Sequence, residues 1–184
     1  MTVLSSFYAM DGKEGVTLNN IQTSVDVTTA PETPQARHKL GDRVQGNGGS
    51  EWLFVQASVT VTAYNFIAID AAFQVRNGTS ALATSNAYVY GIAEFPPNQL
   101  GTTVSIGNAN GGVANPGDYF WAALKIAAGG QVNAAVTAAV GAKLFISTVI
   151  PGTLSSSATA IQITGIALVG TILATISVPQ TMEF

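Results

Sequence analysis

Short stretches in which apolar and polar side chains alternate follow one another from residue 51 to the end of the chain. Turns rich in glycine and proline separate them, such as GNANGG, NPGD, AAGGQ and IPGTL. Short strands at this spacing are typical of all-β proteins. The sequence therefore predicts an all-β body, an antiparallel β-sandwich or barrel, with strands at 52–61, 65–75, 86–95, 102–106, 118–126, 131–138, 142–148, 160–163 and 171–178.

One of these strands has a helix as its open alternative. The stretch QVNAAVTAAVGAKLF is rich in alanine, which by itself favours a helix. However, Val132, Ala134, Val136 and Ala138 share one parity, and a strand would bury them on one face. We expect a strand here, with a helix over 132–140 as the other possibility.

A second stretch, 161–178, carries no charge and has 18 residues, about the length at which a helix can cross a membrane. Its apolar side chains lie on odd positions at Ile161 and Ile163 and on even positions at Ile172 and Ile176. This change of parity indicates two strands joined by a turn. The sequence therefore predicts strands and no contact with a membrane.

Charge is concentrated near the N-terminus. Ten of the seventeen Asp, Glu, Lys and Arg residues lie between Asp11 and Glu51, and only seven lie in 52–184. Residues 1–40 show no sustained period, and Pro31 and Pro34 favour extended backbone around them. We therefore predict an extended N-terminal arm over 1–40, with a short strand near 15–21, and a body over 41–184.

The composition excludes several classes of function. Cysteine is absent and His38 is the only histidine, so the chain offers no zinc ligand set. His38 lies in the arm between Arg37 and Lys39, and we expect it to be solvated rather than to activate a serine. The net charge is -3 with no basic patch, which argues against nucleic acid. We expect no catalytic residue, no metal site and no cofactor.

The low charge has a further consequence. Only 9% of the residues are charged, against roughly 25% in ordinary domains, and such a surface resists self-association poorly. We therefore expect a homo-oligomer. The scattered carboxylates Asp70, Glu94 and Asp118 are expected at turns rather than paired for glycoside chemistry. The pair Tyr119 and Trp121 is expected in the core or at an interface, with a sugar-binding face as the alternative.

The segment DYFWAALKIAAGGQVNAAVTAAVGAKLFISTVIPGTL, residues 118–154, resembles the capsid decoration (cement) proteins of tailed bacteriophages. The similarity lies in an aromatic strand, an alanine- and valine-rich strand, the sequence GAKLF and the turn PGTL. The segment GDRVQGNGGSEWLFVQAS, residues 41–58, is similar to the place where the arm of those proteins joins the first core strand. After the turn this chain has SSSATA where the family carries an acidic run.

The resemblance implies an all-β oligomer, a homotrimer or else a dimer, on the outer surface of an icosahedral virion, with the major capsid protein as its partner. In such a protein the charged arm would lie across neighbouring capsid subunits. The arm residues expected to make these contacts are Phe7, Tyr8, Asp11, Lys13, Glu14, Arg37 and Lys39, with Arg43 just beyond them. The alternatives are a β-rich tail or fibre component, which would polymerise alone, and a carbohydrate-binding module.

Overall fold

The computed structural model describes residues 21–22, 38–46, 49–83, 87–94, 112–126, 130–133, 143–156, 162–163, 173–176 and 180–181. Almost all regular structure in these ranges is strand, and the one helix among them is the short α2 (Ser80–Ala83). The expected strand at 102–106 lies outside the described residues. The prediction of an all-β body is confirmed.

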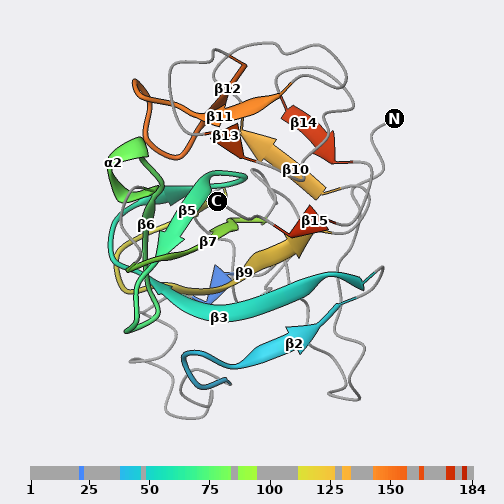
Figure 1. Cartoon of the computed structure of the whole chain (residues 1–184). Coiled ribbons are helices and arrows are strands. Elements are labelled where there is room, and N and C mark those ends of the chain that lie inside the picture. The colour runs from blue at the N-terminus through green and yellow to red at the C-terminus, as the bar shows by residue number, and fades with distance from the viewer. Residues whose placement is uncertain are drawn as a thin grey trace.

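Five strands close into a barrel at the centre of the molecule (Figure 1). They are β3 (Glu51–Ala57), β6 (Gln74–Asn77), β5 (Phe66–Ile69), β7 (Val89–Ile92) and β9 (Tyr119–Ile126), in this order around the ring. The longest pairing joins β9 back to β3, whereas β7 meets β9 at a single residue pair, Ile92 and Ala123. All neighbours are antiparallel except β3 and β6, which run parallel.

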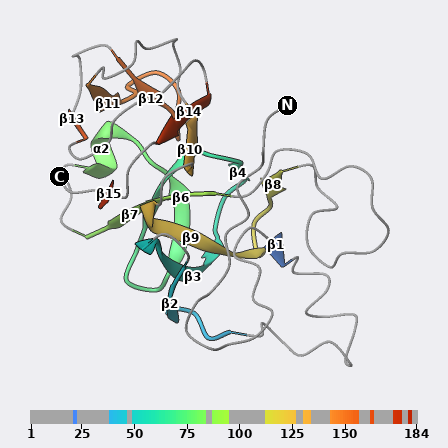
Figure 2. The same cartoon turned by 90° about the vertical axis from the view of Figure 1, so that its right-hand side faces the viewer.

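Shorter strands surround the barrel. Figure 1 shows β2 (Arg43–Gln45) alongside β3, and Figure 2 shows β1 (Ile21–Gln22) beside the start of β9. The others are β4 (Val61–Thr62), β8 (Val113–Ala114), β10 (Gly130–Asn133), β11 (Leu144–Ile146), β12 (Leu154–Ser155), β13 (Gln162–Ile163), β14 (Leu173–Ile176) and β15 (Gln180–Thr181).

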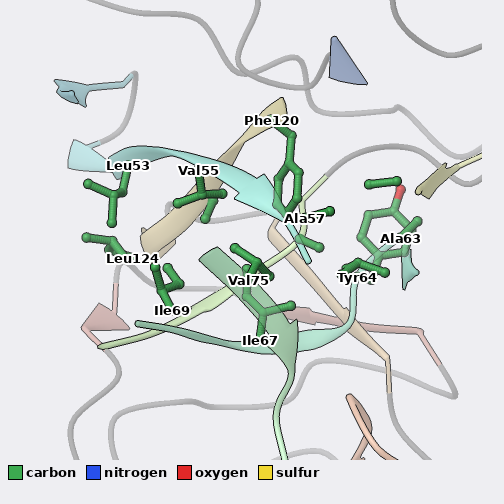
Figure 3. Close-up of a cluster of buried hydrophobic side chains, with 14 residues drawn as sticks. Leu53, Val55, Ala57, Ala63, Tyr64, Ile67, Ile69, Val75, Phe120 and Leu124 are labelled. Atoms are coloured by element: carbon green, nitrogen blue, oxygen red, sulfur yellow. The ribbon is translucent and has the colours of Figure 1, made fainter. Parts of the chain in front are cut away.

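The barrel strands are apolar on both faces. In β3, for example, Leu53 and Val55 belong to one buried cluster, and Trp52 and Phe54 belong to another. The first cluster, which we call the barrel core, fills the interior between β3, β9, β5 and β6 (Figure 3). Five strands enclose a space that side chains alone can fill. The barrel is therefore a packed core and not a pore.

The second cluster, which we call the outer layer, covers the outside of the same strands. Its members on the barrel are Trp52, Phe54, Phe66, Ala68, Tyr90, Ile92, Trp121 and Ala123. Val44 of β2 packs on it, as do Leu144, Ile146 and Leu154 of β11 and β12. Because the surrounding strands bury this second face, the barrel strands carry apolar residues at nearly every position.

The prediction of a single strand at 65–75 is wrong, because these residues form a hairpin of two strands, β5 and β6. The turn between them forms without glycine or proline. Asp70 Oδ1 accepts hydrogen bonds from the backbone N–H of Ala72 at 2.9 Å and of Gln74 at 3.0 Å. Phe73 completes the turn with a φ of 61°, in the left-handed region. The expected strand 52–61 likewise divides into β3 and β4.

The uncharged stretch 161–178 contains two strands, as predicted, but they belong to different sheets: β13 pairs with β11, and β14 pairs with β10. No helix in the described part of the chain is long and apolar enough to cross a membrane. Residues 131–133 form a strand, as expected, and the rest of the alanine-rich stretch lies outside the described residues.

Candidate interaction surface

The last residues of the predicted arm form a tight turn that is fixed to the barrel. Lys39 and Asp42 close this turn: the N–H of Lys39 donates to Asp42 Oδ2 at 2.9 Å, and the N–H of Asp42 donates to the Lys39 carbonyl at 2.9 Å. The backbone of Phe54 in β3 then bonds to both sides of the turn, accepting from Gly41 and donating to Asp42, each at 2.9 Å. We call residues 38–42 the arm base.

His38 lies in this arm base and is half-buried, so the expectation that it is solvated is wrong. Its ring packs edge-on against Phe54 and Trp121, with centroids 5.3 Å and 4.9 Å away. Leu40 packs against the same outer layer. The arm therefore joins the body where its last residues pack on aromatic side chains of β3 and β9.

Two of the residues predicted to contact the capsid are described by the structure: Lys39 lies in the arm base, and Arg43 directly follows it. Lys39 is exposed. Arg43 is exposed at 58% of its side chain, and its Nη1 forms a salt bridge of 2.9 Å with Glu51 Oε1 on β3. Such an exposed pair contributes only about 0–1 kcal/mol to stability. The other predicted contacts, Phe7, Tyr8, Asp11, Lys13, Glu14 and Arg37, lie outside the described residues.

The scattered carboxylates have local structural partners, as expected for Asp70 and Asp118. Asp70 caps the β5–β6 turn, and buried Asp118 accepts a hydrogen bond from the N–H of Asn115 at 2.8 Å. Within the described ranges no three His, Cys, Asp or Glu side chains gather as a metal site.

Glu94 differs from these two, because it is buried close to an aromatic hydroxyl. Its exposed fraction is 3%, and the neighbouring Tyr64 is 5% exposed. Burial, together with the charge of Glu94, raises the pKa of Tyr64 to about 12. Tyr64 also has a φ of 64°, which is a strained conformation for an aromatic residue. The Tyr64 hydroxyl therefore keeps its proton to a higher pH than an ordinary tyrosine does.

The aromatic pair Tyr119 and Trp121 does not form an exposed face. Trp121 is only 3% exposed, and it lies beneath His38. Tyr119 stacks on Phe54 with ring centroids 5.9 Å apart and planes 9° from parallel. A sugar ring needs an open aromatic face, so this pair offers none.

An apolar turn between β11 and β12 projects into solvent. Val149 is 83% exposed and Ile150 is 50% exposed, and Pro151 follows them at the surface. The turn is nevertheless held firmly. Ser147 Oγ accepts hydrogen bonds from the N–H of Val149 at 3.2 Å and of Ile150 at 3.1 Å. Thr153 Oγ1 donates to the Ile150 carbonyl at 2.8 Å.

Gly152 fixes the base of this turn to the barrel. Its N–H donates to the Gly78 carbonyl at 2.9 Å, and its carbonyl accepts from Phe66 at 2.7 Å. Its φ is 80°, and a Cβ here would lie 2.5 Å from Asn65 Nδ2. Asn65 Nδ2 in turn donates to Asn77 Oδ1 at 2.9 Å. Only glycine fits at this position.

A third exposed apolar residue belongs to the same end of the molecule. Asn77 Nδ2 donates to the Thr60 carbonyl at 3.0 Å, which ties the turn that carries Val59 to the network below Gly152. Val59 is 38% exposed. We call Val59, Val149, Ile150 and Pro151 the apolar tip. Among the described residues, three of the four exposed large apolar side chains belong to it.

The apolar tip is not among the features predicted from the sequence. The pattern that could have revealed it is TVIPG, in which apolar residues occupy a turn that ordinarily carries polar ones. Neither a family model, nor a curated protein, nor a solved structure matches this chain.

Proposed function

We propose that this protein is a structural virion protein that binds the outside of an icosahedral phage capsid and stabilises it as a cement protein. The observation that carries the proposal is the division of the chain into a charged segment and a neutral, rigid body. Ten of the seventeen charged residues precede Trp52, seven of these ten lie in the arm over 1–40, and the arm base fixes the end of the arm to β3.

Such a division suits a clamp. An extended segment can follow the surface of neighbouring subunits, and its charges give contacts that salt weakens. Because His38 of the arm base packs on Phe54 and Trp121, an arm bound to the shell would also hold the barrel in place. Because the clamp binds only the assembled shell, it shifts the equilibrium toward assembly by mass action.

The closed barrel supports a small oligomer over a polymerising tail or fibre component. Each barrel strand has a neighbour on both sides, so the ring offers no long free edge to which another copy could add a strand. The buried Trp121 removes the aromatic face that a carbohydrate-binding module would have used. We expect a homotrimer, with a dimer as the alternative, in sedimentation velocity at micromolar concentration.

Truncation of the arm tests the proposal. Deleting residues 1–36 removes most of the arm but keeps His38 and Leu40, which pack on the outer layer. The full chain and the truncated chain would each be mixed with empty heads of the virus that encodes the protein, and bound copies would be counted after sedimentation.

We expect the full chain to bind and the truncated chain to keep a cooperative melt but lose binding. Full occupancy by the truncated chain would show that the arm is not the clamp. Failure of both chains to bind would contradict the cement function itself.

A further inference from the structure

The apolar tip is exposed and rigid at the same time, a combination that an ordinary surface turn does not need. Seven hydrogen bonds hold residues 147–153. Two go to Ser147 Oγ, one comes from Thr153 Oγ1, and two join Gly152 to Gly78 and Phe66. The other two are backbone bonds, from the N–H of Ser147 to the Thr153 carbonyl and from the N–H of Thr153 to the Ile150 carbonyl. Consecutive exposed apolar residues lower the solubility of a protein unless something covers them. Rigidity lowers the entropy cost of binding, because little conformational freedom is left to lose.

The stretch of chain that carries Val149 and Ile150 has no charged residue of its own. No Asp, Glu, Lys or Arg occurs between Lys143 and Glu183. A surface that binds the turn between β11 and β12 therefore gains nothing from charge, and an unpaired charge in it would be costly to bury. The fitting partner is an uncharged apolar pocket.

The size of the tip excludes a self-sufficient dimer interface. From the exposed fractions of Val59, Val149 and Ile150, these three residues together expose roughly 300 Å². A stable interface between two proteins buries about 800 Å² on each partner. The tip is instead the size of a hot spot, which adds affinity where another contact already holds the two partners together.

We infer that the apolar tip is a second anchor, which inserts Val149 and Ile150 into an uncharged apolar pocket on the protein shell. This inference rests on the proposed function. The arm and the tip would act together on one surface, the arm through charge and the tip through apolar burial. Salt weakens the first contact and leaves the second intact.

The test uses one double variant and one single variant of the full chain on the same empty heads. Val149→Ser with Ile150→Ser removes the apolar side chains of the tip, and both positions are exposed, so the fold is expected to persist. Val89→Ser is the matched control, because Val89 is 48% exposed, close to Ile150 at 50%.

Val89 is also far from the tip along the barrel. It pairs with Ile69 at one end of the β5–β7 ladder, whereas Phe66, which bonds to Gly152, lies at the other end. Three residues of strand separate these ends by about 10 Å.

We expect the double variant to bind heads about 30-fold or more weakly than the unaltered chain, which is the loss typical of hot-spot residues. The Val89→Ser control should bind within about twofold, as expected for an exposed side chain outside the contact. The difference should persist when salt is raised from about 0.1 M to about 1 M, where the arm contributes least.

Three results would overturn the inference. Equal binding by the double variant and the unaltered chain would show that the tip is no anchor, while leaving the cement function standing. A smaller oligomer of the double variant in sedimentation velocity would assign the tip to contact between copies. No binding by the unaltered chain would overturn both this inference and the proposed function.

Discussion

Replacing Gly152 by alanine should destabilise the protein through both the backbone and the side chain. The φ of Gly152 is 80°, a region where a residue with a Cβ costs about 1 kcal/mol or more. The added Cβ would also lie 2.5 Å from Asn65 Nδ2 and 3.0 Å from Asn77 Oδ1. The hydrogen bond between these two side chains must then break or shift.

The size of the effect follows from these two terms. Disrupting a partly buried hydrogen bond costs about 1–3 kcal/mol, because its donor and acceptor lose their partners. Together with the backbone cost, Gly152→Ala should lower the free energy of unfolding by about 3 kcal/mol. For a protein of this size that corresponds to about 9 °C in melting temperature.

Gly49 provides the matched control. Its φ is 79°, nearly the same as at Gly152, but a Cβ there would meet no atom within 4 Å. Gly49→Ala should therefore lose only the backbone term, about 1 kcal/mol or about 3 °C. Thermal unfolding followed by circular dichroism measures both variants. Equal losses in the two variants would refute the claim that side chains are packed around the base of the apolar tip.

Two further predictions concern the barrel. Burial and Glu94 raise the pKa of Tyr64 from 10.0 to about 12, so the folded state keeps this proton longer than the unfolded state. The contribution of Tyr64 to the free energy of unfolding is fully present below pH 10 and is lost as pH rises toward about 12. Urea unfolding at increasing pH should show this loss, and Tyr64→Phe should reduce it; an unchanged slope in the variant would contradict the assignment. Phe66→Ala should cost about 3–5 kcal/mol, because the Phe66 ring is fully buried and stacks on Tyr90 at 5.5 Å. The exposed Val89→Ala should change the free energy of unfolding by less than about 0.5 kcal/mol, and a Phe66→Ala loss of the same size would refute the packing.

The strands that the sequence predicted best are those with strong local patterns. β9 (Tyr119–Ile126) lies within the expected 118–126, bounded by the NPGD turn on one side and AAGGQ on the other. The β5–β6 hairpin was missed because its turn uses Asp70 as a hydrogen-bond acceptor and Phe73 in the left-handed region. Asp is common in turns, but Asp70 stands among apolar residues with no glycine or proline beside it, and phenylalanine is not a turn residue.

The surface features depended on contacts between distant parts of the chain. His38 looked solvated between Arg37 and Lys39, since its partners Phe54 and Trp121 lie 16 and 83 positions further on. The exposure of Val149 and Ile150 likewise depends on where Gly152 bonds to Gly78 and Phe66. Periodicity identifies which side chains share a face of a strand, but it does not identify what covers that face.

A cryo-EM map of empty heads incubated with the full chain would test the cement function most directly. Our account predicts barrel-shaped density on the outer surface of the shell at subunit junctions, with the density of the arm running from His38 across neighbouring capsid subunits. The apolar tip would face the shell. The account would be contradicted if the map of these heads showed no density for the barrel although the protein was present in large excess over the heads.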